Sequence, residues 1–299
     1  MDGPADSYVT IRSYEPLVFI VRQLRADVPR ESMLELLRTD TSLTGPDRFR
    51  ENSINLAARL LTMLKIGRAE NQVAARGYLD WSAGTLRELI SQRFSDAPIL
   101  DFTHTRFPKT FDAWSLDSIS GLSIEFTDNI ADHLLLVDDD TTVLIFHHVT
   151  FLEYQGPDNL FPPGFIEETK HTLALLFPQG TFGAPQRGKE YKRKWLRKLT
   201  AAAAPCAVDQ RLGHCFGTLR AEQRHIERFH YWRDRLVILK QAFDEATPTT
   251  ISQWWHDRRN GERWYTFWVA ILVLAVTAFL GLVQCVESAL QVYKAFYPS

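Results

Sequence analysis

The sequence predicts an α+β protein, in which a mostly helical cytosolic domain surrounds a small antiparallel sheet and is followed by one C-terminal transmembrane helix. Three observations support this class. The first third of the chain repeats apolar residues at helical spacing, the middle contains short β-type runs, and 23 consecutive residues over 264–286 carry no charge. We expect four parts: the domain over 1–246, a juxtamembrane linker over 247–263, the membrane helix over 264–286 and a short tail over 287–299.

Helical spacing dominates the first hundred residues. Pro46 suits a first helical turn, and a wide apolar face runs from Ile54 to Leu64 before Gly67 ends the pattern. We therefore expect this helix to be buried. Shorter helices are predicted over 15–27, 30–38 and 84–94.

The middle of the chain changes to a β pattern. Residues 122–126, 133–137 and 142–154 are rich in Leu, Val, Ile, Phe and Thr, which predicts strands. The three aspartates at 138–140 indicate a turn between the last two runs, so a hairpin or meander is expected. Apolar residues on both sides of 143–146 predict a strand that is covered on both faces.

Helical patterns return in the last third of the domain. They predict helices over 163–177 and 188–203 and a longer one over about 218–246. Bases and acids alternate in the longest helix, so we expect it to present a salt-bridged surface. A short helix over 249–259 is expected to lead into the membrane segment.

Residues 264–286 have the length and composition of a membrane span. As a helix this run is about 35 Å long, enough to cross a hydrocarbon core of about 30 Å. Three arginines precede the run and one lysine follows it, which predicts that the large N-terminal part faces the cytosol. Aromatic residues flank the run as in an interfacial belt. The expected interface residues are Trp264, Tyr265, Trp268 and Tyr293.

The route of insertion follows from the opening residues. They are acidic and polar, and the apolar run at 17–21 is too short for a signal peptide. We therefore expect a tail-anchored, single-pass protein, with the endoplasmic reticulum or a connected membrane favoured. Small residues such as Gly281 line up with Gln284 and Glu287, which suggests a homo-oligomer formed through the membrane helix. The alternative is that the helix leaves the bilayer near Glu287.

The densest set of ionisable side chains falls within 128–148. Asp138, Asp140 and His147 are the candidate metal ligands, because hard cations need clustered oxygen atoms. The competing interpretation is an acidic hairpin turn, since Asp hydrogen-bonds its own backbone. Adjacent strand residues point to opposite faces, so His147 and His148 are not expected to share one ion. Further ligands whose convergence the spacing does not require are Asp101, His104 and His133.

A basic helix is predicted within 187–198, which holds seven bases and one acid. Near an anionic leaflet each base contributes about 1 kcal/mol, so an anionic lipid surface is the expected partner. A solvated helix face is the alternative, and the net charge of -2 indicates no nucleic-acid partner. The residues expected to contact the membrane surface are Lys189, Lys192, Arg193, Lys194, Trp195, Arg197 and Lys198.

Motifs for cofactors and catalysis are weak or missing. Gly183 to Lys189 nearly matches a phosphate-binding loop, but Glu190 replaces the hydroxyl residue that would bind magnesium. No hydrolase motif occurs. The three cysteines suit a reducing compartment, and Cys285 lies within the predicted span. The sequence predicts no cofactor and no catalytic residue.

Three blocks carry a resemblance. They are RFRENSINLAARLLTMLKIG near the start, FTDNIADHLLLVDDDTTVLIFHH in the middle, and the region from FHYWRDRLVILK to WYTFWVAILVL near the end. Together they resemble a large group of uncharacterised single-pass membrane proteins of filamentous fungi, and the resemblance covers most of the chain. It implies a cytosolic domain on one membrane helix, and it implies no activity, cofactor or catalytic residue.

We therefore expect a non-enzymatic adaptor or scaffold at a membrane surface. The alternative hypothesis is a membrane-associated accessory enzyme that acts on an apolar metabolite within fungal secondary metabolism. That enzyme would use Asp138, Asp140 and His147 around a metal ion.

Overall fold

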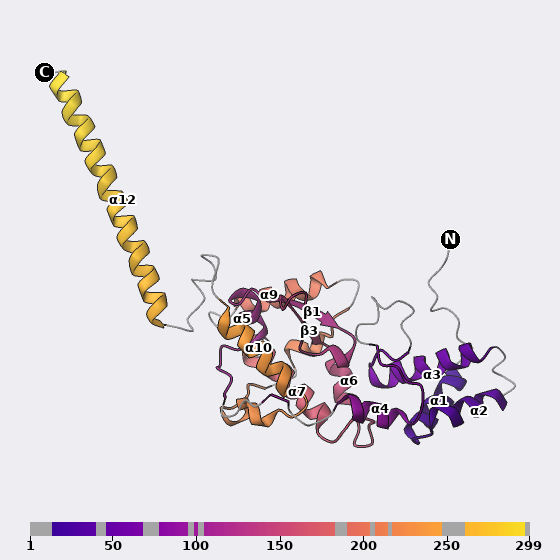
Figure 1. The fold of residues 1–299 in the computed structure, drawn as a ribbon. Helices are drawn as coiled ribbons and strands as arrows, with labels where there is room; N and C mark the ends of the chain where they lie inside the picture. The colour runs from indigo at the N-terminus through magenta and orange to yellow at the C-terminus, as the bar shows by residue number, and fades with distance from the viewer. Residues whose placement is uncertain are drawn as a thin grey trace, which may run out of the picture.

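A small three-stranded sheet surrounded by helices confirms the predicted α+β class, and one long helix, α12 (Gly261–Phe296), stands apart from the rest (Figure 1). Buried side chains from Ile20 to Phe243 form one continuous hydrophobic core. The computed structural model describes residues 14–39, 46–67, 78–94, 99–100, 105–182, 190–203, 207–214, 217–246 and 261–296. The helix predicted over 249–259 lies outside these residues.

The helices predicted near the N-terminus are confirmed. Pro46 precedes the first turn of the longest one, which buries Ile54 and Ala57 and ends at Met63 in a left-handed conformation. Thr85 and Glu88 start the last one with a reciprocal capping box, which satisfies two backbone N–H groups. These helices are α1 (Tyr14–Arg25), α2 (Arg30–Thr39), α3 (Asp47–Thr62) and α4 (Leu86–Arg93).

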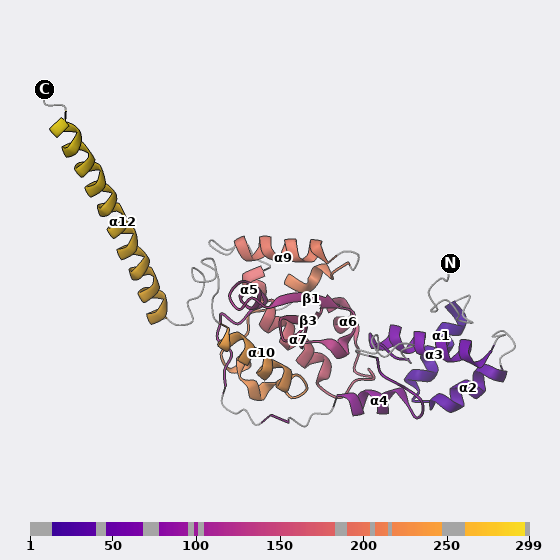
Figure 2. The same ribbon diagram turned by 45° about the horizontal axis from the view of Figure 1, so that its top comes forward.

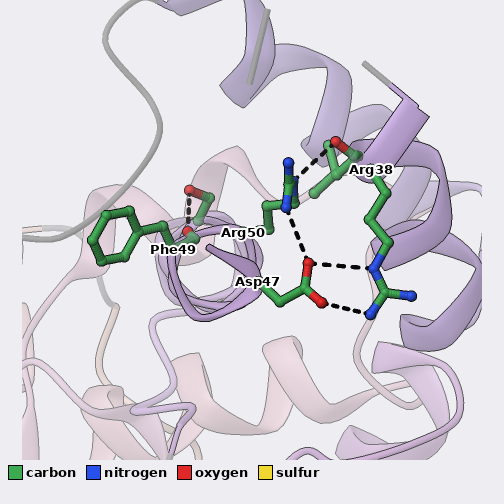
Figure 3. A network of polar contacts seen from close by, with 6 residues as sticks. Arg38, Asp47, Phe49 and Arg50 are labelled. Carbon is green, nitrogen blue, oxygen red and sulfur yellow. Dashed lines mark hydrogen bonds and ion pairs between the residues drawn. The ribbon is translucent and has the colours of Figure 1, made fainter. Parts of the chain in front are cut away.

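A polar clamp joins the last turn of α2 to the first turn of α3 (Figure 3). Arg38 donates from Nε and Nη2 to the two carboxylate oxygens of Asp47, at 3.3 and 2.7 Å. Arg50 donates to the same carboxylate and, through Nε, to the carbonyl oxygen of Leu37. The hydrogen bond from Arg38 lowers the pKa of Asp47. The clamp therefore links the end of α2 to the start of α3.

The sheet has the strand order β1-β3-β2, and it is mixed, so the expectation of a wholly antiparallel sheet was wrong. β2 (Leu135–Val137) and β3 (Thr142–Phe146) form the predicted antiparallel hairpin. β1 (Ser123–Thr127) pairs with β3 in parallel, with Ser123 opposite Thr142 and Thr127 opposite Phe146. The parallel pair places the carboxyl ends of β1 and β3 at the same edge of the sheet.

The central strand β3 is covered on both faces, as predicted, since Val143, Ile145 and Phe146 are fully buried. The expected continuation of this strand to residue 154 was wrong. The chain instead begins α6 (Val149–Tyr154), which buries Val149 and Leu152 at helical spacing. The carboxylate of Asp209 accepts the N–H of Thr150 at 2.6 Å, so a distant residue satisfies a first-turn donor of this helix.

The single helix expected over 218–246 was also wrong. The chain makes two short 3-10 turns, η5 (Glu222–Arg224) and η6 (Ile226–Arg228), before α10 (Arg233–Glu245). Ile226, Phe229 and Trp232 are buried, so one side of this segment packs on the core, while Lys240 and Asp244 form an ion pair on α10. Arg224 is buried too, and its Nη1 donates to the carbonyl oxygen of Phe107 at 2.6 Å.

Two further predicted helices are confirmed, namely α7 (Phe165–Leu176) and α9 (Glu190–Ala202). Figures 1 and 2 show α9 and α5 (Ala113–Ser118) on one side of the sheet and α7 on the other. The carboxylate of Glu168 on α7 is buried and accepts the N–H groups of His230 and Trp232, each at 2.9 Å. This side chain therefore caps the start of α10.

A buried histidine joins α7 to the sheet. The N–H of Phe146 donates to Nδ1 of His133 at 3.2 Å, so the neutral ring carries its proton on Nε2. That nitrogen lies 2.7 Å from Oγ1 of Thr172. Burial, together with the positive charge of Arg235, lowers the pKa of His133 to about 3. Protonation of Nδ1 would break the bond from Phe146, so the fold requires the neutral ring.

We predict that acid destabilises the protein through His133. In the unfolded chain the imidazole of His133 takes up a proton near pH 6.5, whereas in the folded chain it stays neutral until about pH 3. Stability from this group is therefore complete above the unfolded pKa, and it falls by about 1.4 kcal/mol per pH unit as the pH drops below it. Urea unfolding of the full chain in detergent, followed by near-UV circular dichroism, measures this slope.

The matched variant is His133→Gln, which cannot take up the proton. Between about pH 6 and pH 4 its free energy of unfolding should depend on pH less steeply than that of the wild type, by up to about 1.4 kcal/mol per unit. Burial also lowers the pKa of His147 and His171, so part of the slope remains in the variant. Identical slopes in the two proteins would contradict the assignment to His133.

Candidate functional site

The helix α12 has the properties of a membrane span. Among the described residues it is the one helix long and apolar enough to cross a bilayer, over the 29 residues Tyr265–Tyr293. None of the most apolar stretch is buried against the rest of the protein, and side chains such as Leu274 and Leu280 are more than half exposed. A helix with apolar side chains on every face and no protein cover requires an apolar surrounding.

The predicted span and the observed helix agree at the start and differ at the end. The helix continues past Glu287 to Phe296, through residues that we expected to form a tail. Tyr265 and Tyr293 are exposed at the two ends of the span, and the rings of Phe267 and Trp268 meet edge to face at 5.4 Å. The side chain of Trp264 lies outside the described part. The aromatic belt and self-association through this helix remain predictions.

A polar contact holds the basic helix α9 on α5. Lys192 donates from Nζ to Oδ2 of Asp112 at 2.6 Å, and the side chains are 11% and 3% exposed. The same ammonium group lies 4.6 Å from the ring centre of Trp114. One turn further along, Nε1 of Trp195 donates to Oδ2 of Asp117 at 2.6 Å. These contacts fix which face of α9 turns toward the domain.

The opposite face of α9 is a stripe of bases. Lys194, Arg197 and Lys198 are exposed and Arg193 is half-buried, and the i, i+4 spacing places them side by side. We call these four residues the basic stripe. It contains four of the seven residues that we expected at the membrane surface.

The other three expected contact residues lie elsewhere. The expectation that Lys192 contacts the membrane surface was wrong, because its ammonium group is buried in an ion pair and faces away from the basic stripe. Trp195 is half-buried, and its indole N–H faces α5. Lys189 lies outside the described residues. The position of each residue around the helix axis decides whether it faces α5 or solvent, and the composition of the segment alone does not reveal this.

A second polar site lies where β1 and β3 end. Nε2 of His148 and Nε2 of His147 lie 2.7 and 3.2 Å from the same oxygen, Oδ1 of Asp128. The two imidazole rings are tilted by 34° to each other, with centres 4.0 Å apart. The N–H of Asp209 donates to Nδ1 of His147 at 3.2 Å. We call Asp128, His147 and His148 the His-Asp cluster.

The electrostatics of the His-Asp cluster follow from unequal burial. His147 is fully buried, whereas the side chains of His148 and Asp128 are 27% and 53% exposed. Burial, and secondly the neighbouring His148, lower the pKa of His147. Burial disfavours the charged form of Asp209, but hydrogen bonds from the backbone of Thr150 and Arg211 outweigh it and lower the pKa of this carboxyl. Asp209 is therefore a fixed negative charge beside the two rings.

The predicted metal ligands do not meet in this site. Among the described residues, the side chains that could share an ion are Asp128, His147 and His148, and this group includes neither Asp138 nor Asp140. Both of those aspartates lie in the β2–β3 turn with φ of 53° and 61°, a left-handed conformation that Asp tolerates. The acidic-turn interpretation therefore accounts for their backbone.

Two other expectations about this region need correction. His147 and His148 share one carboxylate oxygen, because β3 ends at Phe146 and neither histidine continues the strand alternation. His133 is buried in the core and bonded to Thr172, so it is unavailable as a ligand. Asp101 and His104 lie outside the described residues.

Sequence reasoning missed Asp128 and Asp209. Each strand of the parallel pair is followed by a polar residue, Asp128 after β1 and His147 after β3, and neighbouring parallel strands bring such residues together. The signal was present, but it becomes visible only when the pairing is known to be parallel. Asp209 comes from a segment more than fifty residues away and carries no such signal.

No family model, curated protein or solved structure matches this chain. What the protein does is therefore inferred from its own residues.

An open cleft of about 1200 Å³ lies between α7 and the segment 217–231. Its acidic residues are already engaged, since Glu167 pairs with Lys170, Glu153 pairs with Arg211 and Glu168 caps α10. Nε2 of His171 is buried and has no hydrogen-bond partner among the described residues. One such nitrogen in a wide polar cleft does not define a catalytic arrangement.

We predict that the buried ion pair under α9 is required for stability. Lys192→Met should lower the free energy of unfolding by about 3–5 kcal/mol, because it leaves the carboxylate of Asp112 buried without its cation. The double variant Asp112→Asn/Lys192→Met removes both charges and should lose less than Lys192→Met alone. Urea unfolding of the full chain in detergent measures both losses.

Lys194→Met on the basic stripe is the matched control, since it removes an exposed charge from the same helix. It should change stability by no more than about 0.5 kcal/mol. Equal effects of Lys192→Met and Lys194→Met would show that the pair contributes nothing to stability.

Proposed function

We propose that the protein is a single-pass membrane protein whose folded domain serves as a non-enzymatic adaptor at the cytosolic surface of the bilayer. The observation that carries this proposal is α12, a 29-residue apolar span without protein cover. The orientation is supported by the sequence next to the span, because Arg258, Arg259 and Arg263 precede it and Lys294 follows it.

The basic stripe supports a second contact with the same membrane. Lys194, Arg197 and Lys198 are exposed and Arg193 is half-buried, because Lys192 and Trp195 hold the opposite face of α9 on α5. A rigid row of bases on a tethered domain meets anionic headgroups at a high local concentration. Each base near such a leaflet contributes on the order of 1 kcal/mol, so the stripe favours one face of the domain toward the bilayer.

The structural roles of the buried ionisable groups support an adaptor over an enzyme. Glu168 caps α10, His133 joins α7 to the sheet, Lys192 holds α9 and Arg224 binds the carbonyl oxygen of Phe107. Active sites usually have perturbed ionisable groups in a cleft and free to react. These four groups are bonded within the fold, and the exception is His171 in the cleft, whose buried Nε2 has no hydrogen-bond partner among the described residues.

We predict that α12 inserts and carries its C-terminal end across the bilayer. A glycosylation acceptor fused through a spacer after residue 299 should be modified in microsomes, and an acceptor fused before residue 1 should not. Leu274→Arg/Leu280→Arg should abolish the modification, because each arginine at the centre of a span costs about 2.5–3.5 kcal/mol. Gel mobility with and without glycosidase measures the modified fraction.

Gln291→Arg is the control, because a charge near the end of the span can reach the headgroups. This variant should remain modified. Modification of the N-terminal acceptor would reverse the proposed orientation. Modification of neither acceptor in a protein that carbonate releases from the microsomes would exclude insertion.

We predict that anionic lipid protects α9. The full chain in nanodiscs should show slower hydrogen exchange over 190–203 when phosphatidylserine is present than in phosphatidylcholine alone. Salt at about 1 M should remove the difference, because it shortens the screening length to about 3 Å. The variant Arg193→Glu/Lys194→Glu/Arg197→Glu should show no lipid-dependent protection.

A matched variant, Arg22→Glu/Arg25→Glu/Lys109→Glu, changes the net charge equally at exposed positions outside the stripe. It should retain the protection over 190–203. Equal exchange in the two lipids for the wild type would contradict a lipid-binding stripe. In that case α12 would still be supported as a membrane contact, and the stripe would not.

A further inference from the structure

We propose that the His-Asp cluster binds a divalent first-row transition-metal ion. Nε2 of His147, Nε2 of His148 and a carboxylate oxygen of Asp128 all lie within 4.8 Å of one another. Two imidazoles and one carboxylate are a donor set that such ions prefer. This inference concerns a site separate from α12 and the basic stripe, and it does not depend on the proposed function.

The hydrogen bonds of the cluster show where the ion would lie. The distances of 2.7 and 3.2 Å from Oδ1 of Asp128 mean that each imidazole directs its Nε2 at the same oxygen. Each contact is a hydrogen bond with one proton, which the imidazole donates from Nε2 to the carboxylate oxygen. An ion between the three atoms replaces these protons and keeps the same three partners. The three side chains are therefore already assembled, but binding requires the two rings to move apart and the bond from Asp209 to break.

One contact opposes binding. Nδ1 of His147 accepts the N–H of Asp209, so Nε2 of this neutral ring carries the proton. Coordination through Nε2 moves that proton to Nδ1 and gives up the bond from Asp209. We therefore expect His148 and Asp128, which are the exposed members, to contribute most of the affinity. The carboxylate of Asp209, bonded to the N–H groups of Thr150 and Arg211, adds negative charge next to the ion.

The two imidazole rings lie closer together than one shared ion allows. With metal–nitrogen bonds of about 2.1 Å, imidazoles at 90° have ring centres roughly 4.6 Å apart, and imidazoles at the tetrahedral angle have centres roughly 5.3 Å apart. The observed separation of 4.0 Å is shorter than both values, so the two rings must move apart before both bind one ion. The spacing therefore does not discriminate between a six-coordinate and a tetrahedral ion. Solvent reaches Asp128 and His148, so water completes the coordination.

The position of the cluster indicates what the ion does. Asp128 follows β1, His147 and His148 connect β3 to α6, and Asp209 belongs to the segment that comes after α9 in the chain. An ion here joins chain segments at the carboxyl edge of the sheet. Binding to the folded chain stabilises it against unfolding. We assign the ion a structural role at this edge.

The test uses the full chain in detergent, purified without a polyhistidine tag, and Co²⁺ as the probe. We expect one Co²⁺ per chain by titration calorimetry, with a visible d–d absorption band of protein-bound cobalt that the cluster variants lose. Asp128→Asn and His148→Ala should each weaken binding at least as much as the roughly 10- to 100-fold seen when an outer-shell partner of a metal site is lost. Asp128→Asn preserves the shape of a half-exposed side chain, and near-UV circular dichroism checks its fold.

The matched control is Asp138→Asn/Asp140→Asn, which removes two carboxylates from the nearby turn. Asn tolerates the left-handed conformation of these positions, so the turn should persist and Co²⁺ affinity should not change. Absence of Co²⁺ binding to the folded wild type would overturn the proposal. Binding that survives both cluster variants, or that the control variant abolishes, would overturn it equally.

Discussion

The parallel pairing of β1 with β3 is the constraint on which the rest of the domain depends. It places β3 at the centre of the sheet, with its apolar side chains buried on both faces. It also ends both strands at one edge, where Asp128 meets His147 and His148. Asn129, the next residue, caps a 3-10 turn and accepts the N–H of Lys65, so the same edge is tied to the N-terminal helices.

Buried charge is the second organising feature. A buried charged group is stable only when hydrogen-bond or ion-pair partners replace its hydration. Each such group therefore requires a particular partner beside it. Glu168 specifies the start of α10, and the pair of Lys192 with Asp112 specifies the rotation of α9 about its axis. This rotation turns Lys194, Arg197 and Lys198 outward. The proposed membrane-facing surface is thus a consequence of packing inside the domain.

Local patterns predicted the elements that local patterns control. The apolar periodicity of α3, the aspartate turn between β2 and β3 and the double burial of β3 were all read correctly from neighbouring residues. The errors fall where distant residues decide the structure. The carboxylate of Asp209 accepts the N–H of Thr150, which supports a helix where the composition favours a strand. Trp232 is buried in the core, and the helix expected over 218–246 is interrupted before it.

The sequence by itself determined that α12 is long and apolar enough to cross a membrane, because hydrophobic length is a property of consecutive residues and needs no partner. It also determined the helix-rich class and the hairpin, which depend on short-range periodicity. Only the tertiary structure decided that Asp128, and not Asp138 or Asp140, meets His147. Only the tertiary structure showed which bases of α9 face outward. Both depend on pairings between segments far apart in the chain, and such pairings leave no periodic signal in a single sequence.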